Sequence, residues 1–167
     1  MTDERPDAVD RIAEQWARER PGLDVGAILV VGRLHRAADL LDQRLRPVFA
    51  EAGLGNGDFD VLAALRRAGA PYRLTPTELA GTTMVTSGAV TKRVDRLERQ
   101  GLVERTVSED DARGRVIALT PEGMRVQERL HPQHLANEDQ LLGALDESER
   151  ERLAGLLSKL LLSLEEG

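Results

Sequence analysis

The chain has 167 residues, of which 41% are apolar and 31% charged, a length and composition that fit one domain with a packed core. It contains no cysteine, which excludes disulfides, thiolate metal sites and cysteine nucleophiles. The formal net charge is −6, but the charges are segregated. Eight acidic and three basic residues lie between Glu138 and Gly167, whereas four basic and two acidic residues lie between Thr82 and Gln100. The locally basic segment is compatible with phosphate contacts.

Targeting signals and membrane spans are not expected. The N-terminus is acidic and polar, unlike a signal peptide, and no apolar run approaches the roughly 18 residues that cross a bilayer. We therefore expect a cytoplasmic protein with no membrane partner. Aromatic residues make up only 2% of the chain, which favours helices over an all-β fold.

Two helices are predicted before the middle of the chain. The first covers about residues 7–20 and ends at Pro21-Gly22. Its apolar face comprises Val9, Ile12, Ala13 and Trp16. A long amphipathic helix follows over about residues 25–51, with Pro47 near its end.

Three shorter helices follow. Asp58 is the expected N-cap of a helix that ends at about Arg67. Thr75 and Glu78 form a capping box for a short helix that stops near Gly81. The next helix covers about residues 87–100.

The hydrophobic period then changes from helical to alternating. Residues 102–107 and 115–119 are predicted strands, and the polar loop between them would form the tip of a β-wing. A helix is expected over about residues 120–144, and Asp146 with Glu149 forms the capping box of a last helix. That helix carries a leucine stripe too wide for one small domain to bury, which predicts a partner subunit. The stripe comprises Leu153, Leu156, Leu157, Leu160, Leu161 and Leu164.

The order helix, turn, helix, strand, loop, strand predicts a winged helix-turn-helix. In the helix over residues 87–100, Val90, Val94 and Leu97 would face inward, which leaves small and basic residues for the major groove. Arginines on the wing suit the minor groove. The predicted DNA-binding residues are Thr86, Ser87, Thr91, Lys92, Arg96, Asp111, Arg113 and Arg115. The plainer alternatives are an ordinary surface helix and a solvated, charged turn.

The stretch TSGAVTKRVDRLERQGLVERTVSEDDARGRVIALTPEG resembles the winged-helix core of the MarR family of bacterial regulators. The resemblance implies a mainly α fold with a small β-wing, in a dimeric architecture to which residues 1–24 add an N-terminal helix. It assigns residues 25–57 and 120–167 to dimerisation and residues 58–119 to DNA binding, within a single compact domain. It also implies a homodimeric repressor that binds a pseudo-palindromic operator in double-stranded DNA and is released by a small ligand.

The first helix with WARERPGLDV, and the stretches GRLHRAADLL and FDVLAALRRAGAPY, are similar to the urate-responsive PecS-like branch of that family. The resemblance implies that Trp16, Asp60, Arg93 and Arg105 form or couple to the ligand site. The chemistry suits a planar anion such as urate, because an indole offers a stacking face and a guanidinium offers paired donors. Alternatively, Trp16 only anchors the first helix and Asp60 only favours a helix N-terminus.

No enzyme, metal or cofactor site is predicted. His35, His131 and His134 are expected on the surface, and the chain has no recognisable catalytic motif. Two alternatives to a urate-type repressor stay open. One is a MarR-like repressor that responds to a phenolic compound, another carboxylate or a drug. The other is a non-regulatory protein that binds or degrades a small metabolite.

Overall fold

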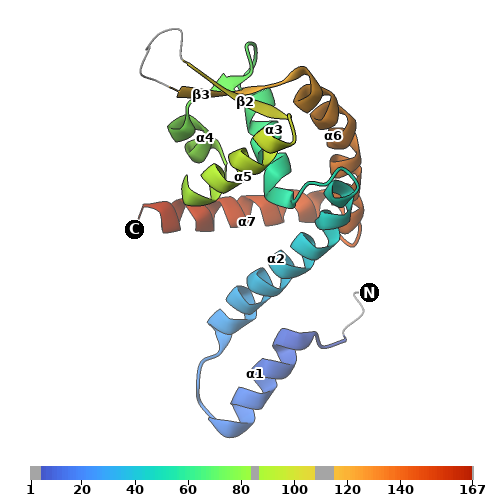
Figure 1. The fold of residues 1–167 in the computed structure, drawn as a ribbon. Coiled ribbons are helices and arrows are strands. Elements are labelled where there is room, and N and C mark those ends of the chain that lie inside the picture. The colour runs from blue at the N-terminus through green and yellow to red at the C-terminus, as the bar shows by residue number, and fades with distance from the viewer. Residues whose placement is uncertain (1–4, 84–86, 108–114, 167) are drawn as a thin grey trace. The chain divides into compact units, whose positions relative to one another are not determined.

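The computed structural model describes residues 5–83, 87–107 and 115–166. These residues form helices and three short strands, confirming the predicted mainly α class (Figure 1). Within them, no helix is both long and apolar enough to cross a membrane. The elements are α1 (Ala8–Glu19), α2 (Gly26–Ala50), α3 (Asn56–Arg67), β1 (Arg73–Leu74), α4 (Pro76–Thr82), α5 (Ser87–Arg99), β2 (Val103–Val107), β3 (Arg115–Leu119), α6 (Pro121–Leu141) and α7 (Glu147–Glu165).

The chain divides into two compact units, Met1–Arg44 and Leu45–Gly167. The division falls inside α2, so the last turns of that helix belong to the C-terminal unit.

The N-terminal unit joins α1 to the first part of α2. Asp7 caps α1 by accepting hydrogen bonds from the amides of Val9 at 2.7 Å and Asp10 at 3.0 Å. Arg33 of α2 pairs with both carboxylates, at 2.8 Å from Asp7 and 2.6 Å from Asp10. Val9 is buried against Gly32, where an added Cβ would lie 3.0 Å from the Val9 side chain. The contact between Val9 and Gly32 and the ion pairs of Arg33 therefore join the two helices.

The C-terminal unit contains a three-stranded antiparallel sheet in the order β1-β3-β2. The predicted wing strands pair as expected, with Val103 opposite Leu119 and Val107 opposite Arg115. Strand β1 was not predicted from the sequence, because it has only two residues and shows no alternation. It pairs with β3 through Arg73 opposite Ala118.

The core of this unit lies between α3, α5, the sheet and α6. Its largest fully buried apolar side chains are Phe49, Phe59, Leu62, Leu65, Leu79, Leu97, Val61, Val94 and Val103. Helix α6 runs without interruption through Pro132. In contrast, no residue of α7 is buried.

Candidate DNA-binding and ligand-binding site

Helices α4 and α5 form the predicted helix pair. The Thr75 hydroxyl oxygen caps α4 by accepting a hydrogen bond from the Glu78 amide at 3.2 Å, and the Glu78 carboxylate accepts one from the Thr75 amide at 2.8 Å. Helix α5 buries Val90, Val94 and Leu97, which are 3%, 1% and 0% exposed, so its inward face is the predicted one. Thr91 and Lys92 are exposed, as a surface that reads DNA requires.

The wing can be described only at its base. Thr86, Asp111 and Arg113 lie outside the described residues, and the side chain of Ser87 is not described either. Arg115 is exposed at the first position of β3.

Arg96, a predicted DNA-binding residue, makes an ion pair with Asp58 of α3. Asp58 is fully buried, whereas the Arg96 side chain is 46% exposed. The prediction that Asp58 is an N-cap is wrong: α3 begins at Asn56 after the N-cap Gly55, and Asp58 occupies the third helical position. From there its carboxylate accepts a hydrogen bond from the Gly55 amide at 2.9 Å. Arg96 therefore ties the recognition helix to the first turn of α3.

We expect Arg96→Ala to lower the free energy of unfolding by about 3 kcal/mol, because it leaves the buried Asp58 carboxylate without its cation. Urea denaturation monitored by circular dichroism measures this loss. Arg99→Ala is the matched control, since Arg99 is an exposed arginine of the same helix that donates to the Asp95 carbonyl at 3.2 Å. Its substitution is expected to cost about 0.5 kcal/mol or less. Equal losses in the two variants would show that the Asp58 pair is not stabilising.

Arg105, a predicted ligand residue on β2, ion-pairs with Asp95 and Glu98 of α5. These two carboxylates raise the pKa of the Arg105 guanidinium, with the hydrogen bond to Asp95 as the largest cause. The pairs connect a wing strand to the recognition helix.

Arg93 and Asp60, two of the predicted ligand residues, are brought together by α5 and α3. Arg93 packs its guanidinium against the first turn of α3 at Gly57, where an added Cβ would fall on the guanidinium carbon. Nη1 of Arg93 is buried and has no hydrogen-bond partner among the described residues. Only a residue without a side chain leaves room for this arrangement.

Asp60 follows one turn later on α3 and is partly buried. Burial raises the pKa of its carboxyl above the usual value, and the positive charges of Arg93 and Arg67 and the nearby His134 oppose that shift. A carboxylate that is costly to desolvate beside a cation with an unused donor is typical of a binding site rather than of a packed core.

Trp16, the fourth predicted ligand residue, belongs to the N-terminal unit, whereas Asp60, Arg93 and Arg105 belong to the C-terminal unit. Trp16 is 43% exposed, so its indole is not merely a core residue of α1. Ile12, one turn earlier, is 45% exposed.

His134 was predicted as a surface residue rather than as part of a site. It is not a surface residue, since only 17% of its side chain is exposed. Its ring lies against Phe49 and Phe59, with centroids 5.2 and 5.3 Å away. Nδ1 is buried without a partner among the described residues, and Nε2 lies 3.2 Å from Glu138. The i, i+4 spacing of His134 and Glu138 was the available signal, but it is common on solvated helix faces.

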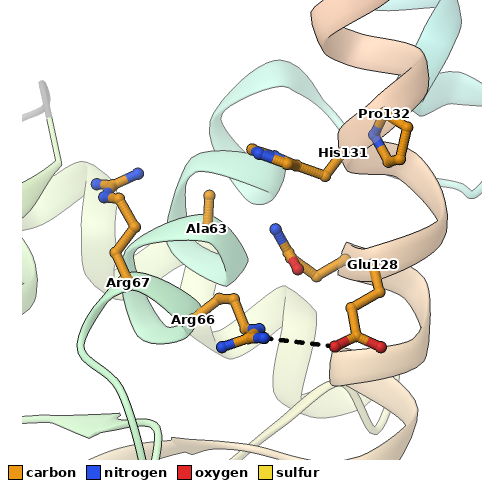
Figure 2. A pocket seen from close by; sticks show the side chains of 7 residues that line it. Ala63, Arg66, Arg67, Glu128, His131 and Pro132 are labelled. Carbon is orange, nitrogen blue, oxygen red and sulfur yellow. Dashed lines mark ion pairs between the residues drawn. The ribbon is translucent and has the colours of Figure 1, made fainter.

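An open pocket of about 460 Å³ lies between α3 and α6 (Figure 2). Figure 2 shows His131 extending from α6 toward α3, and Arg66 paired with Glu128 at 3.6 Å. Ala63, also in its lining, is one helical turn beyond Asp60. The lining residues are Ala63, Arg66, Arg67, Gln127, Glu128, His131 and Pro132.

Comparisons with known proteins find relatives of this chain in both sequence and fold. The model of the MarR family matches residues 52–114. The HTH-type transcriptional regulator PecS of Dickeya dadantii is 40% identical over 151 residues, which are 90% of this chain and 91% of that protein. The HTH-type transcriptional repressor YetL of Bacillus subtilis is 30% identical over 146 residues, 87% of each chain.

A similar solved structure is that of Sco3205, a MarR family transcriptional regulator from Streptomyces coelicolor in complex with DNA. It superposes with a TM-score of 0.76 and 28% identity, covering 87% of this chain and 92% of that one. These relatives are regulators of transcription rather than enzymes. Together, the extent and identity of the PecS match and the family model show that this chain belongs to the PecS-like branch of the MarR family of transcriptional regulators.

Proposed function

We propose that this protein is a homodimeric repressor that binds a pseudo-palindromic operator and is released from it by urate or a similar planar anion. The observation that carries the proposal is Arg93 of the recognition helix. Its Nη1 is buried and has no hydrogen-bond partner in the described part of the chain, and its positive charge interacts with Asp60. A ligand oxygen that bonds to this nitrogen would act directly on the helix that reads DNA.

The DNA-binding part of the proposal rests on the exposed face of α5. Lys92 and Thr91 lie on it, and Arg115, Arg113 and Asp111 belong to the predicted wing. The similar protein Sco3205 is described in complex with DNA. Two such heads in a dimer would enter successive major grooves, roughly 34 Å apart.

Coupling between ligand and DNA follows from the contacts of α5. Arg93 packs on α3, and Arg105 joins the same helix to β2. An anion that pairs with Arg93 changes its contact with α3 and so alters the position of α5. Because binding free energies are reciprocal, operator DNA would weaken anion binding by the same factor.

The ligand part of the proposal rests on Asp60, Arg93 and Trp16. A carboxylate accepts ring N–H bonds, a guanidinium donates to an anionic oxygen, and an exposed indole offers a stacking face.

A titration of operator binding with urate tests the proposal, with fluorescence anisotropy of a labelled upstream fragment as the measurement. We expect urate to weaken operator binding at least about tenfold, which corresponds to about 1.4 kcal/mol of coupling. Arg93→Ala should bind operator without responding to urate, and Arg99→Ala should respond like the wild type. An equal response in Arg93→Ala would contradict the assigned site.

Other outcomes separate the alternatives. A thermal shift with salicylate but not with urate would indicate a MarR-like repressor with a different ligand. No salt-dependent operator binding at all would favour the metabolite-binding alternative.

A further inference from the structure

Two buried side-chain nitrogens lack a hydrogen-bond partner within the described residues, and the side chains that carry them pack on α3 at Gly57 and at Phe59, on either side of Asp58 and next to Asp60. They are Nη1 of Arg93 on α5 and Nδ1 of His134 on α6. Both side chains interact electrostatically with Asp60 of α3. Three helices thus contribute one polar group each to the same place, and two of the three groups have an unused bonding position.

The imidazole of His134 is held in a fixed orientation. Phe49 and Phe59 lie against it, with the Phe59 ring nearly perpendicular at 66°. Nε2 lies 3.2 Å from the Glu138 carboxylate, an acceptor, so in the neutral ring the proton belongs on Nε2. Nδ1 is then an acceptor that cannot turn to solvent.

Of the two nitrogens without a partner, one is therefore a hydrogen-bond donor and the other an acceptor. Arg93 offers a donor at Nη1, whereas His134 offers an acceptor at Nδ1. Each buried group without a partner costs roughly 1–3 kcal/mol, which a ligand bonding to both would recover. A simple carboxylate such as benzoate presents only acceptors and can satisfy Arg93 alone.

We propose that His134 is a ligand-binding residue and that the cognate ligand is a planar heterocycle with a lactam edge. On that edge a carbonyl or enolate oxygen accepts from Arg93, and ring N–H groups donate to His134 and Asp60. This inference rests on the proposed function, because it adds one residue to the same ligand site and assigns a chemical class to its ligand.

The test uses the full-length protein, with urate as the lactam probe and benzoate as the acceptor-only probe, both measured by calorimetry. His134→Phe keeps the aromatic contacts with Phe49 and Phe59 but removes Nδ1. His134→Asn keeps an acceptor close to that position. His35→Phe is the control, since His35 is an exposed histidine of α2 that does not line the pocket between α3 and α6.

The urate dissociation constant should rise about tenfold in His134→Phe, the effect of one lost hydrogen bond. In His134→Asn it should return to within about threefold of the wild-type value, and in His35→Phe it should not change. Benzoate should not distinguish the wild type from His134→Phe. Independently of any substitution, ¹⁵N NMR should show the His134 Nδ1 resonance shifting when urate is added to the wild type.

The outcomes separate this inference from the proposed function. If urate does not bind the wild type, both fail. If urate binds and Arg93→Ala abolishes binding, but His134→Phe binds normally and Nδ1 does not shift, only the role of His134 is overturned.

Discussion

Replacing Gly57 by alanine is expected to abolish the response to the ligand while the protein stays folded and still binds its operator. A Cβ at position 57 would occupy the space of the Arg93 guanidinium, which must then swing away from α3. Because Gly57 lies within α3, alanine should not weaken the helix, since its helix propensity is more favourable than that of glycine by up to about 1 kcal/mol. We expect the urate dissociation constant to rise at least about tenfold, measured by calorimetry.

Gly81→Ala is the matched control for this substitution. Gly81 also lies within a helix, but nothing lies within 4 Å of its Cβ position. Both variants should unfold at or slightly above the wild-type temperature, and only Gly57→Ala should lose the ligand. If Gly57→Ala binds urate with wild-type affinity, the position of Arg93 against α3 is not what creates the site.

The ends of most helices were predictable because short polar motifs determine them. The predicted Thr75–Glu78 and Asp146–Glu149 capping boxes each satisfy free amides of a first turn in the structure. The inward face of α5 was also predictable, since Val90 and its neighbours repeat at helical spacing.

The errors arise where a side chain bonds across the fold. Asp58 has the residue type of an N-cap, but Gly55 takes that position and Asp58 is buried against Arg96. Local propensity cannot show an ion pair between residues 38 positions apart. For the same reason, the sequence could not show that Gly57 makes room for Arg93, or that His134 turns inward against two phenylalanines.

The contacts of α5 also change how DNA affinity should be understood. Arg96 pairs with Asp58, and Arg93 packs on Gly57, so neither guanidinium is free to approach phosphates without breaking an internal contact. Lys92 remains exposed on this helix. The recognition helix of one subunit thus has little positive charge available for phosphates, and the chain has a net charge of −6. Tight operator binding should therefore depend on the DNA-binding regions of two subunits joined in a dimer.

A charge on the leucine stripe of α7 is therefore expected to abolish operator binding without touching the DNA-binding head. Leu156, Leu161 and Leu164 are 59%, 56% and 69% exposed in the single chain, and burying each in a partner would contribute about 1.5–3 kcal/mol. Leu156→Glu with Leu160→Glu should convert the dimer into a monomer, measured by analytical ultracentrifugation. Operator affinity should fall at least about a hundredfold, as expected when two linked heads act separately.

Leu162→Glu is the control for the effect of a charge on α7 outside the leucine stripe. At about 3.6 residues per turn, Leu162 lies on the side of α7 opposite to Leu153 and the stripe, yet it is similarly exposed at 58%. The same charge at the same exposure should leave the dimer and operator affinity unchanged, because only the stripe is assigned to the partner. If Leu162→Glu dissociates the dimer as strongly as the stripe variant does, the dimer interface includes both sides of α7. If neither variant dissociates the dimer, dimerisation depends on other elements. In the second case the leucine stripe requires a different occupant, and the dependence of DNA binding on α7 disappears with it.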